Sequence, residues 1–152
     1  MKTFARDACR VEAIERLRSV RVDSARRWGT MTPHQMICHC ADAARMALGA
    51  VTPADVSTGL TRHVIKWVAL YAPMRWPAGV QTVSEFDWRT AGAPSTAFDD
   101  DVRALADLLA QVRGRDGGTG WPRHPIFGPM TERAWLRWAY LHMDHHLRQF
   151  GA

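Results

Sequence analysis

The sequence predicts an all-α fold, namely a four-helix bundle with room for an extra short helix and one long loop. Two observations predict it. Apolar residues recur at helical spacing in several segments joined by loops that carry Pro and Gly, and no segment competes with the alternation of a β-strand. The chain has 152 residues, the size of one domain, and neither a repeat nor a linker divides it. We therefore expect residues 1–152 to form a single helical domain.

The first two expected helices lie in the N-terminal third of the chain. The first runs from about Asp7 to Val20. Its apolar positions at helical spacing are Val11, Ile14 and Leu17. The second begins at Thr32, a good N-cap residue, and has Pro33 at a position where the missing N–H costs nothing. It should end near Leu48, because Gly49 suits the left-handed residue that closes many helices.

The remaining helices are separated by a long loop. A third, less regular segment is expected to be helical from about Leu60 to Tyr71, and residues 73–94, rich in Pro and Gly, to form the loop. The next helix should open near Ser95 or Thr96. Its apolar stripe consists of Val102, Leu105, Leu108, Leu109 and Val112. The last helix is predicted to start after Thr131 and to run to about Phe150.

Composition and charge exclude several classes of protein. No apolar run reaches the ~18 residues of a membrane span, and the N-terminus lacks the apolar stretch of a secretory signal. We therefore expect a cytoplasmic protein with no membrane partner. The net charge is +5, but the arginines are spread along the chain and interleaved with acids, which argues against a nucleic-acid partner.

The last helix carries the first chemical signal. His142 and His146 lie one turn apart, at the centre of an apolar stripe. The stripe also contains Trp135, Trp138, Ala139, Met143, Gln149 and Phe150. Imidazoles on a core face are costly unless both are satisfied, and this spacing lets the two bind one metal ion. The alternative is a pair of core histidines hydrogen-bonded across the bundle. His145 is expected on the flank, near the polar boundary.

The second helix favours the metal. His39 shares its face with Met36, Ala43 and Met46, whereas His34 is expected to point toward the polar side with Arg45. One histidine from this helix and His142 and His146 from the last one give three nitrogen ligands. Such a set leaves coordination positions open for water or substrate, as in catalytic zinc sites. Three imidazoles suit zinc, nickel, iron or copper.

Three polar residues near this site have two interpretations each. Asp42 and Gln149 lie about one turn from a proposed ligand, where they could orient an imidazole or make ordinary surface or bundle hydrogen bonds. His124 precedes the last helix and could line the mouth of the cavity. The more frequent role of such a histidine is to hold its loop by a backbone hydrogen bond, and we favour that role.

Two other groups are set aside as metal ligands. Cys38 and Cys40 flank His39, but positions i and i+2 of a helix point roughly 200° apart, so the two thiols cannot meet on one ion. Both are expected to be small buried apolar residues. The acidic run of residues 99–101 is better explained by the positive end of a helix dipole than by a second metal.

Two stretches of the sequence resemble a known family. One runs from Trp28 to Met36 and is followed by His39; the other runs from His124 to Gly128 and is followed by residues 142–151. Their order and content resemble a bacterial group of the DinB-like, or YfiT-like, superfamily. The resemblance covers most of the chain and is loose between residues 51 and 96.

The resemblance implies a fold, a metal and a class of activity. The superfamily is a four-helix bundle in up-down-down-up order that binds a metal through one histidine of the second helix and an HxxxH pair on the last. These positions correspond to His39 and to His142 and His146, and zinc or nickel is the expected ion. Members with known activity include metal-dependent transferases of low-molecular-weight thiols and a thiol-dependent isomerase, whereas many relatives have no established activity.

We therefore expect a metal-dependent enzyme. The leading hypothesis is a thiol-dependent S-transferase that acts on a small electrophilic molecule. The alternative is a metal- or ligand-binding bundle without turnover. The oligomeric state stays open, a homodimer being one possibility.

Overall fold

The computed structural model describes residues 1–78, 96–113 and 120–152, and all regular structure in these ranges is helical. The elements in chain order are α1 (Asp7–Ser19), α2 (Pro33–Leu48), the π-helical turn η1 (Thr61–Ile65), α3 (Lys66–Tyr71), α4 (Phe98–Gln111) and α5 (Glu132–Gln149). The predicted all-α class is confirmed for these residues. The expected loop over residues 73–94 lies outside the described residues from residue 79 onward.

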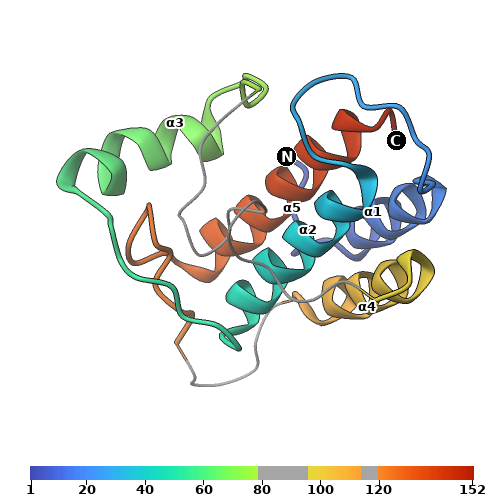
Figure 1. The fold of residues 1–152 in the computed structure, drawn as a ribbon. Coiled ribbons are helices and arrows are strands. Elements are labelled where there is room, and N and C mark those ends of the chain that lie inside the picture. Colours follow the sequence, from blue (N-terminus) through green and yellow to red (C-terminus); the bar gives the residue numbers. More distant parts are fainter. Residues whose placement is uncertain (79–95, 114–119) are drawn as a thin grey trace.

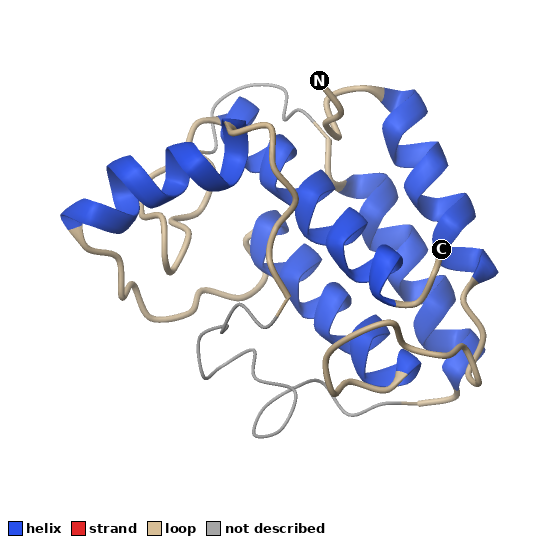
Figure 2. Ribbon diagram, turned by 90° about the horizontal axis from the view of Figure 1, so that it is seen from above, coloured by secondary structure: helices blue, strands red, loops and turns tan. Residues whose placement is uncertain are grey.

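Four of the helices enclose a common core. α1 and α2 each pack against both α4 and α5, and Figure 1 shows α2 and α5 side by side with α4 below them. η1 and α3 project away from these helices and contact α5 through α3 (Figures 1 and 2). The largest fully buried side chains include Trp135, Phe4, Leu17, Met36, Ile37, Leu105 and Met143. No described helix combines the length and the apolarity needed to cross a membrane.

Both ends of α2 are fixed by the residues that predicted them. The Thr32 side chain accepts a hydrogen bond from the Gln35 backbone N–H, and the Gln35 side chain accepts one from the Thr32 N–H, which forms a capping box. Pro33 occupies the first turn. Gly49 has a φ of 79° and its N–H reaches the carbonyls of the last turn. The predicted bounds of this helix are confirmed.

α4 begins slightly later than predicted. The expected start was Ser95 or Thr96, whereas the helix runs from Phe98. Thr96 does not cap the helix, because its N–H and hydroxyl both donate to the Asp101 carboxylate, at 3.0 and 3.2 Å. These two hydrogen bonds fold Thr96 back onto the first turn of α4, so that the helix begins after Ala97, which is its N-cap residue.

The buried face of α1 differs from the predicted one. Val11 is 54% exposed and Ile14 only partly buried, whereas Cys9, Ala13 and Leu17 lie in the core. These three residues follow a four-residue spacing and stay on one side of the helix, while a three-residue spacing drifts around it. Two of the three are small, and the apolar pattern alone therefore gave the wrong phase for the start of α1.

Candidate metal centre

Three histidine rings meet between α2 and α5. His39, His142 and His146 each offer one ring nitrogen, and these three atoms all lie within 4.8 Å of one another. The Nε2 atoms of His39 and His142 are 3.1 Å apart. The ring centroids are separated by 5.0, 4.8 and 4.7 Å. The structure therefore brings together all three residues that the helical faces singled out.

The spacing of these nitrogens fits a divalent ion. Zinc binds imidazole nitrogens at about 2.0–2.1 Å in tetrahedral geometry, which places the nitrogens about 3.3 Å apart. The Nε2 atoms of His39 and His142, 3.1 Å apart, are close to that separation, and all three nitrogens lie within 4.8 Å of one another, so small ring movements would admit the ion. His39 and His146 are buried and His142 is partly exposed. One side of the cluster is thus less enclosed than the other two.

Burial favours the neutral form of His142 and His146. The pKa of His142 lies well below its usual value, chiefly because of burial and then because of the charges that His146 and His39 would carry. The pKa of His146 is also lowered, again mainly by burial and then by His39. A neutral imidazole is the form that binds a metal, so near neutral pH His142 and His146 are in the form that a metal requires.

Gln149 orients one of the rings. Its side-chain oxygen lies 3.1 Å from His146 Nδ1, and its amide nitrogen donates to the Trp28 carbonyl at 2.9 Å. Because that amide nitrogen is already directed to a carbonyl, the oxygen faces His146 and accepts from Nδ1–H. The lone pair of the other ring nitrogen, Nε2, is then free for a metal. Of the two interpretations of Gln149, the orienting one agrees with the structure.

The segment that receives Gln149 approaches it closely. The Arg27 N–H donates to the Gln149 carbonyl at 2.7 Å. Gly29 has a φ of 77°, and a Cβ added there would lie 2.5 Å from the Gln149 amide nitrogen. Both the backbone conformation and the close contact therefore require glycine. Residues 27–29, which we call the strap, hold the end of α5 beside the metal ligands.

Asp42 and His124, the other two polar residues considered near the site, each have a defined partner. Asp42 is buried and forms an ion pair with Arg45 at 2.7 Å. His124 holds its loop, as favoured, because its Nδ1 accepts the N–H groups of Ile126 and Phe127 at 3.1 and 3.2 Å. Burial, more than the charge of nearby Lys66, lowers the pKa of His124 to about 3.

His145 is more enclosed than predicted. It was expected at the polar boundary, but it is buried, with ring centroids 5.8 Å from Trp28 and 6.2 Å from Trp76. The strap and the segment after α3 cover this flank of α5, which helical phase alone could not show. Its pKa is lowered, mainly by burial. His145 is nevertheless not one of the three converging ligands.

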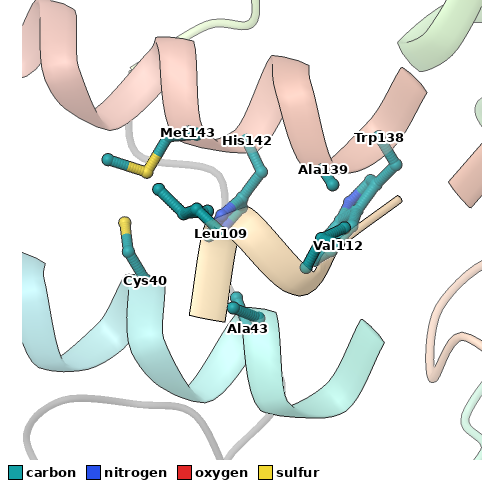
Figure 3. Close-up of a pocket in the computed structure, with 9 residues that line it drawn as sticks. Cys40, Ala43, Leu109, Val112, Trp138, Ala139, His142 and Met143 are labelled. Atoms are coloured by element: carbon teal, nitrogen blue, oxygen red, sulfur yellow. The ribbon is translucent and has the colours of Figure 1, made fainter. Parts of the chain in front are cut away.

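An aromatic and apolar surface borders His142. Trp138 stacks on the His142 ring at 4.9 Å and 24°, and Trp76 meets it edge-on at 6.4 Å. A small pocket between α2, α4 and α5 reaches the same ring (Figure 3). It is lined by Cys40, Ala43, Ala44, Leu109, Val112, Trp138, Ala139, His142 and Met143. One side of the candidate centre is thus apolar.

A second cluster was missed by the sequence analysis. His34 points to Asp101 of α4 rather than toward Arg45, with 2.7 Å between Nε2 and Oδ2. Cys38 is half-buried rather than buried, and its Sγ lies 3.8 Å from the same oxygen. The three donor atoms all lie within 4.8 Å of one another. The four-residue spacing of His34 and Cys38, the same as that of His142 and His146, was the available signal.

Comparison with known proteins gives a family and no relative of known activity. The model of one family, described as a protein of unknown function (DUF1569), matches residues 4–152. Neither the curated proteins nor the solved structures yield a match. The matched span includes every described helix and all three converging histidines. The chain therefore belongs to the DUF1569 family of proteins of unknown function.

Proposed function

We propose that this protein binds one divalent metal ion on His39, His142 and His146 and is a metal-dependent enzyme of the DinB-like superfamily. α1, α2, α4 and α5 would be the four helices of its bundle, in up-down-down-up order. Their mutual packing around one core is compatible with that assignment. Zinc or nickel is the proposed ion, because both accept an all-imidazole ligand set.

The observation that carries the proposal is the convergence of three imidazoles in a largely apolar environment. Burying polar rings costs free energy unless each is satisfied. His39 Nε2 and His142 Nε2 face each other at 3.1 Å, and one proton at most can be shared between them. A metal ion between α2 and α5 would satisfy all three rings at once. Gln149 supports this, since its contact with Nδ1 of His146 leaves Nε2 available.

The reaction that we propose is the transfer of a low-molecular-weight thiol onto a small electrophilic molecule. Three neutral imidazoles cancel none of the charge of a dication, which would act as a Lewis acid and favour a thiolate over the thiol. Trp138 and Trp76 supply aromatic surface beside the partly exposed His142. These side chains would hold the apolar part of a substrate and exclude water from it.

The alternative is a metal- or small-ligand-binding bundle without turnover. One observation favours it. Apart from Cys40 and His142, the described residues that line the pocket beside His142 are apolar, and none of them carries a carboxylate or amine placed to move a proton. A thiol transfer needs less proton chemistry from the protein than a hydrolysis does, so the same observation also weighs against a hydrolase.

The test is elemental analysis of protein purified without a metal-affinity step, followed by a panel of bacterial low-molecular-weight thiols with a general electrophile. We expect His142→Ala to contain about one ion per chain less than the wild type, and thiol-dependent turnover to disappear in this variant. His63→Ala is the matched control, because His63 is exposed on η1. Metal-loaded protein that binds none of these thiols would refute the transferase and leave the alternative.

A further inference from the structure

The cluster of His34, Cys38 and Asp101 forms a contact between α2 and α4, apart from the three converging histidines. We propose that it is a second metal site, specific for a thiophilic divalent cation such as zinc. The ligands would be His34 Nε2, Cys38 Sγ and the Asp101 carboxylate. This site is additional to the proposed function and does not depend on it.

The distances suit a small tetrahedral ion. Zinc–ligand bonds of about 2.0–2.1 Å to nitrogen or oxygen and about 2.3 Å to sulfur place N and O about 3.3 Å apart and S and O about 3.5 Å apart. The corresponding separations here are 2.7 Å for His34 Nε2 to Asp101 Oδ2 and 3.8 Å for Cys38 Sγ to the same atom. Side-chain movements of about half an ångström would therefore admit the ion.

Hydrogen bonding alone accounts poorly for the thiol. Asp101 Oδ2 already accepts from His34 Nε2 at 2.7 Å and from the Thr96 N–H at 3.0 Å. The Cys38 thiol, a weak donor, would be a third partner of this one oxygen at a longer distance. A thiolate bound to a metal shared with the imidazole and the carboxylate gives all three groups a strong interaction instead.

The three side chains are held in place by their surroundings. His34 and Cys38 lie one turn apart on α2, whose two ends are capped, and α2 packs against α4. The His34 ring meets Phe98 edge-on at 5.5 Å, and Thr96 fixes the Asp101 carboxylate. Ligands fixed in this way lose little freedom when a metal binds.

Charge and access also favour a cation. Asp99, Asp100 and Asp101 all lie in the first turn of α4, where Arg103 pairs with Asp100 and Asp99 adds a second negative charge to that of Asp101. The positive charge of Arg45, which acts on Cys38, is paired with Asp42. All three proposed ligands are partly exposed, which leaves an entry path and room for water as a fourth ligand.

Cobalt(II) separates the two sites, because only the second contains a thiolate. Metal-free protein loaded with cobalt should bind two ions per chain and show a thiolate-to-cobalt charge-transfer band in the near ultraviolet. Cys38→Ser should bind one ion and lose the band. His142→Ala should bind one ion and keep the band. Cys40→Ala, which removes the other thiol beside His39, is the control and should retain both ions and the band.

Two results would overturn the second site. They are the absence of a thiolate band at cobalt saturation, or a band that persists in Cys38→Ser. His34 and Asp101 would then form a hydrogen-bonded pair and nothing more. His34→Gln is the companion variant and should lose the same ion if Cys38→Ser folds poorly. If only the three-histidine site fails, the wild type should bind one cobalt ion per chain and still show the thiolate band, and His142→Ala should bind the same number of ions as the wild type.

Discussion

His145 and His146 are adjacent residues whose rings face different surroundings. Their rings are nearly perpendicular, at 86°, with centroids 5.1 Å apart. His146 faces His39 and His142, whereas His145 packs against Trp28 and Trp76. Only one of the two can therefore reach an ion bound between α2 and α5.

We expect His146→Ala to lose bound metal and His145→Ala to keep most of it. Removal of a direct ligand should weaken binding by more than the roughly 10–100-fold that is typical of a residue outside the coordination shell. Metal content after dialysis, measured by elemental analysis, checks this. Equal loss in the two variants would show that the ring assignment is wrong.

His124 makes the stability of the metal-free protein depend on pH. Its pKa is lowered to about 3 in the folded state and is about 6.5 when unfolded. Between about pH 3 and pH 6.5 the unfolded state therefore binds one more proton at His124 than the folded state does. The contribution of His124 to the free energy of unfolding is thus complete above about pH 6.5 and is lost as the pH falls below that value. At about pH 5 this residue alone should remove about 2 kcal/mol from the free energy of unfolding.

Urea unfolding at neutral pH and at about pH 5, in the presence of a chelator, measures this dependence. His124→Asn is the matched variant, because the Asn oxygen can accept the N–H groups of Ile126 and Phe127 but does not titrate. His142 and His146 add to the loss in both proteins. The variant should lose less stability than the wild type, and an equal loss would refute the role of His124.

α1 shows which part of an element a pattern can predict. Its bounds followed from the sequence, but its buried face did not, because the residues that contact the other helices include the small Cys9 and Ala13. Leu17→Ala should lower the free energy of unfolding by about 2–5 kcal/mol, because Leu17 is fully buried. Val11→Ala on the exposed side should change it by less than about 0.5 kcal/mol. Urea unfolding measures both changes, and a small effect at Val11 distinguishes the observed face from the predicted one, which contained both residues.

Periodicity within a helix also explains the success and the failures at the two histidine clusters. It shows which residues share a face, and this was sufficient for His39, His142 and His146, since both faces were apolar around the histidine. It does not show which neighbour covers a face. The partner of His34 on α4 and the aromatic cover over His145 depend on tertiary packing, and neither could be predicted from one helix.

The whole molecule has a large core of its own, and metal should add to its stability without being required for folding. Phe4, Leu17, Met36, Trp135 and Leu147 are fully buried in described residues from both ends of the chain, unlike the small core of a zinc finger that is unfolded without its ion. Chelation should lower the melting temperature and leave the far-ultraviolet helical signal largely intact at room temperature. Loss of that signal on chelation would contradict this.

The strap has a consequence for the rate at which a bound ion can leave. Helix ends normally open and close with free energies near zero, and their amide hydrogens exchange quickly with solvent. His146 lies in the last turn of α5, yet the strap hydrogen-bonds both the backbone and the side chain of Gln149. Fraying of this turn, which would release a ligand, is therefore coupled to displacement of the strap.

Native-state hydrogen–deuterium exchange should accordingly show the last turn of α5 as slow as its centre. In Gly29→Ala the added Cβ would clash with the Gln149 side chain and move the strap away from it. The amide hydrogens of this last turn alone should then exchange faster than in the wild type. A bound metal ion should also dissociate faster from this variant. Equal exchange rates of these amides in the wild type and the variant would mean that core packing, and not the strap, holds the end of α5. Release of the ion would then require a larger opening of the protein.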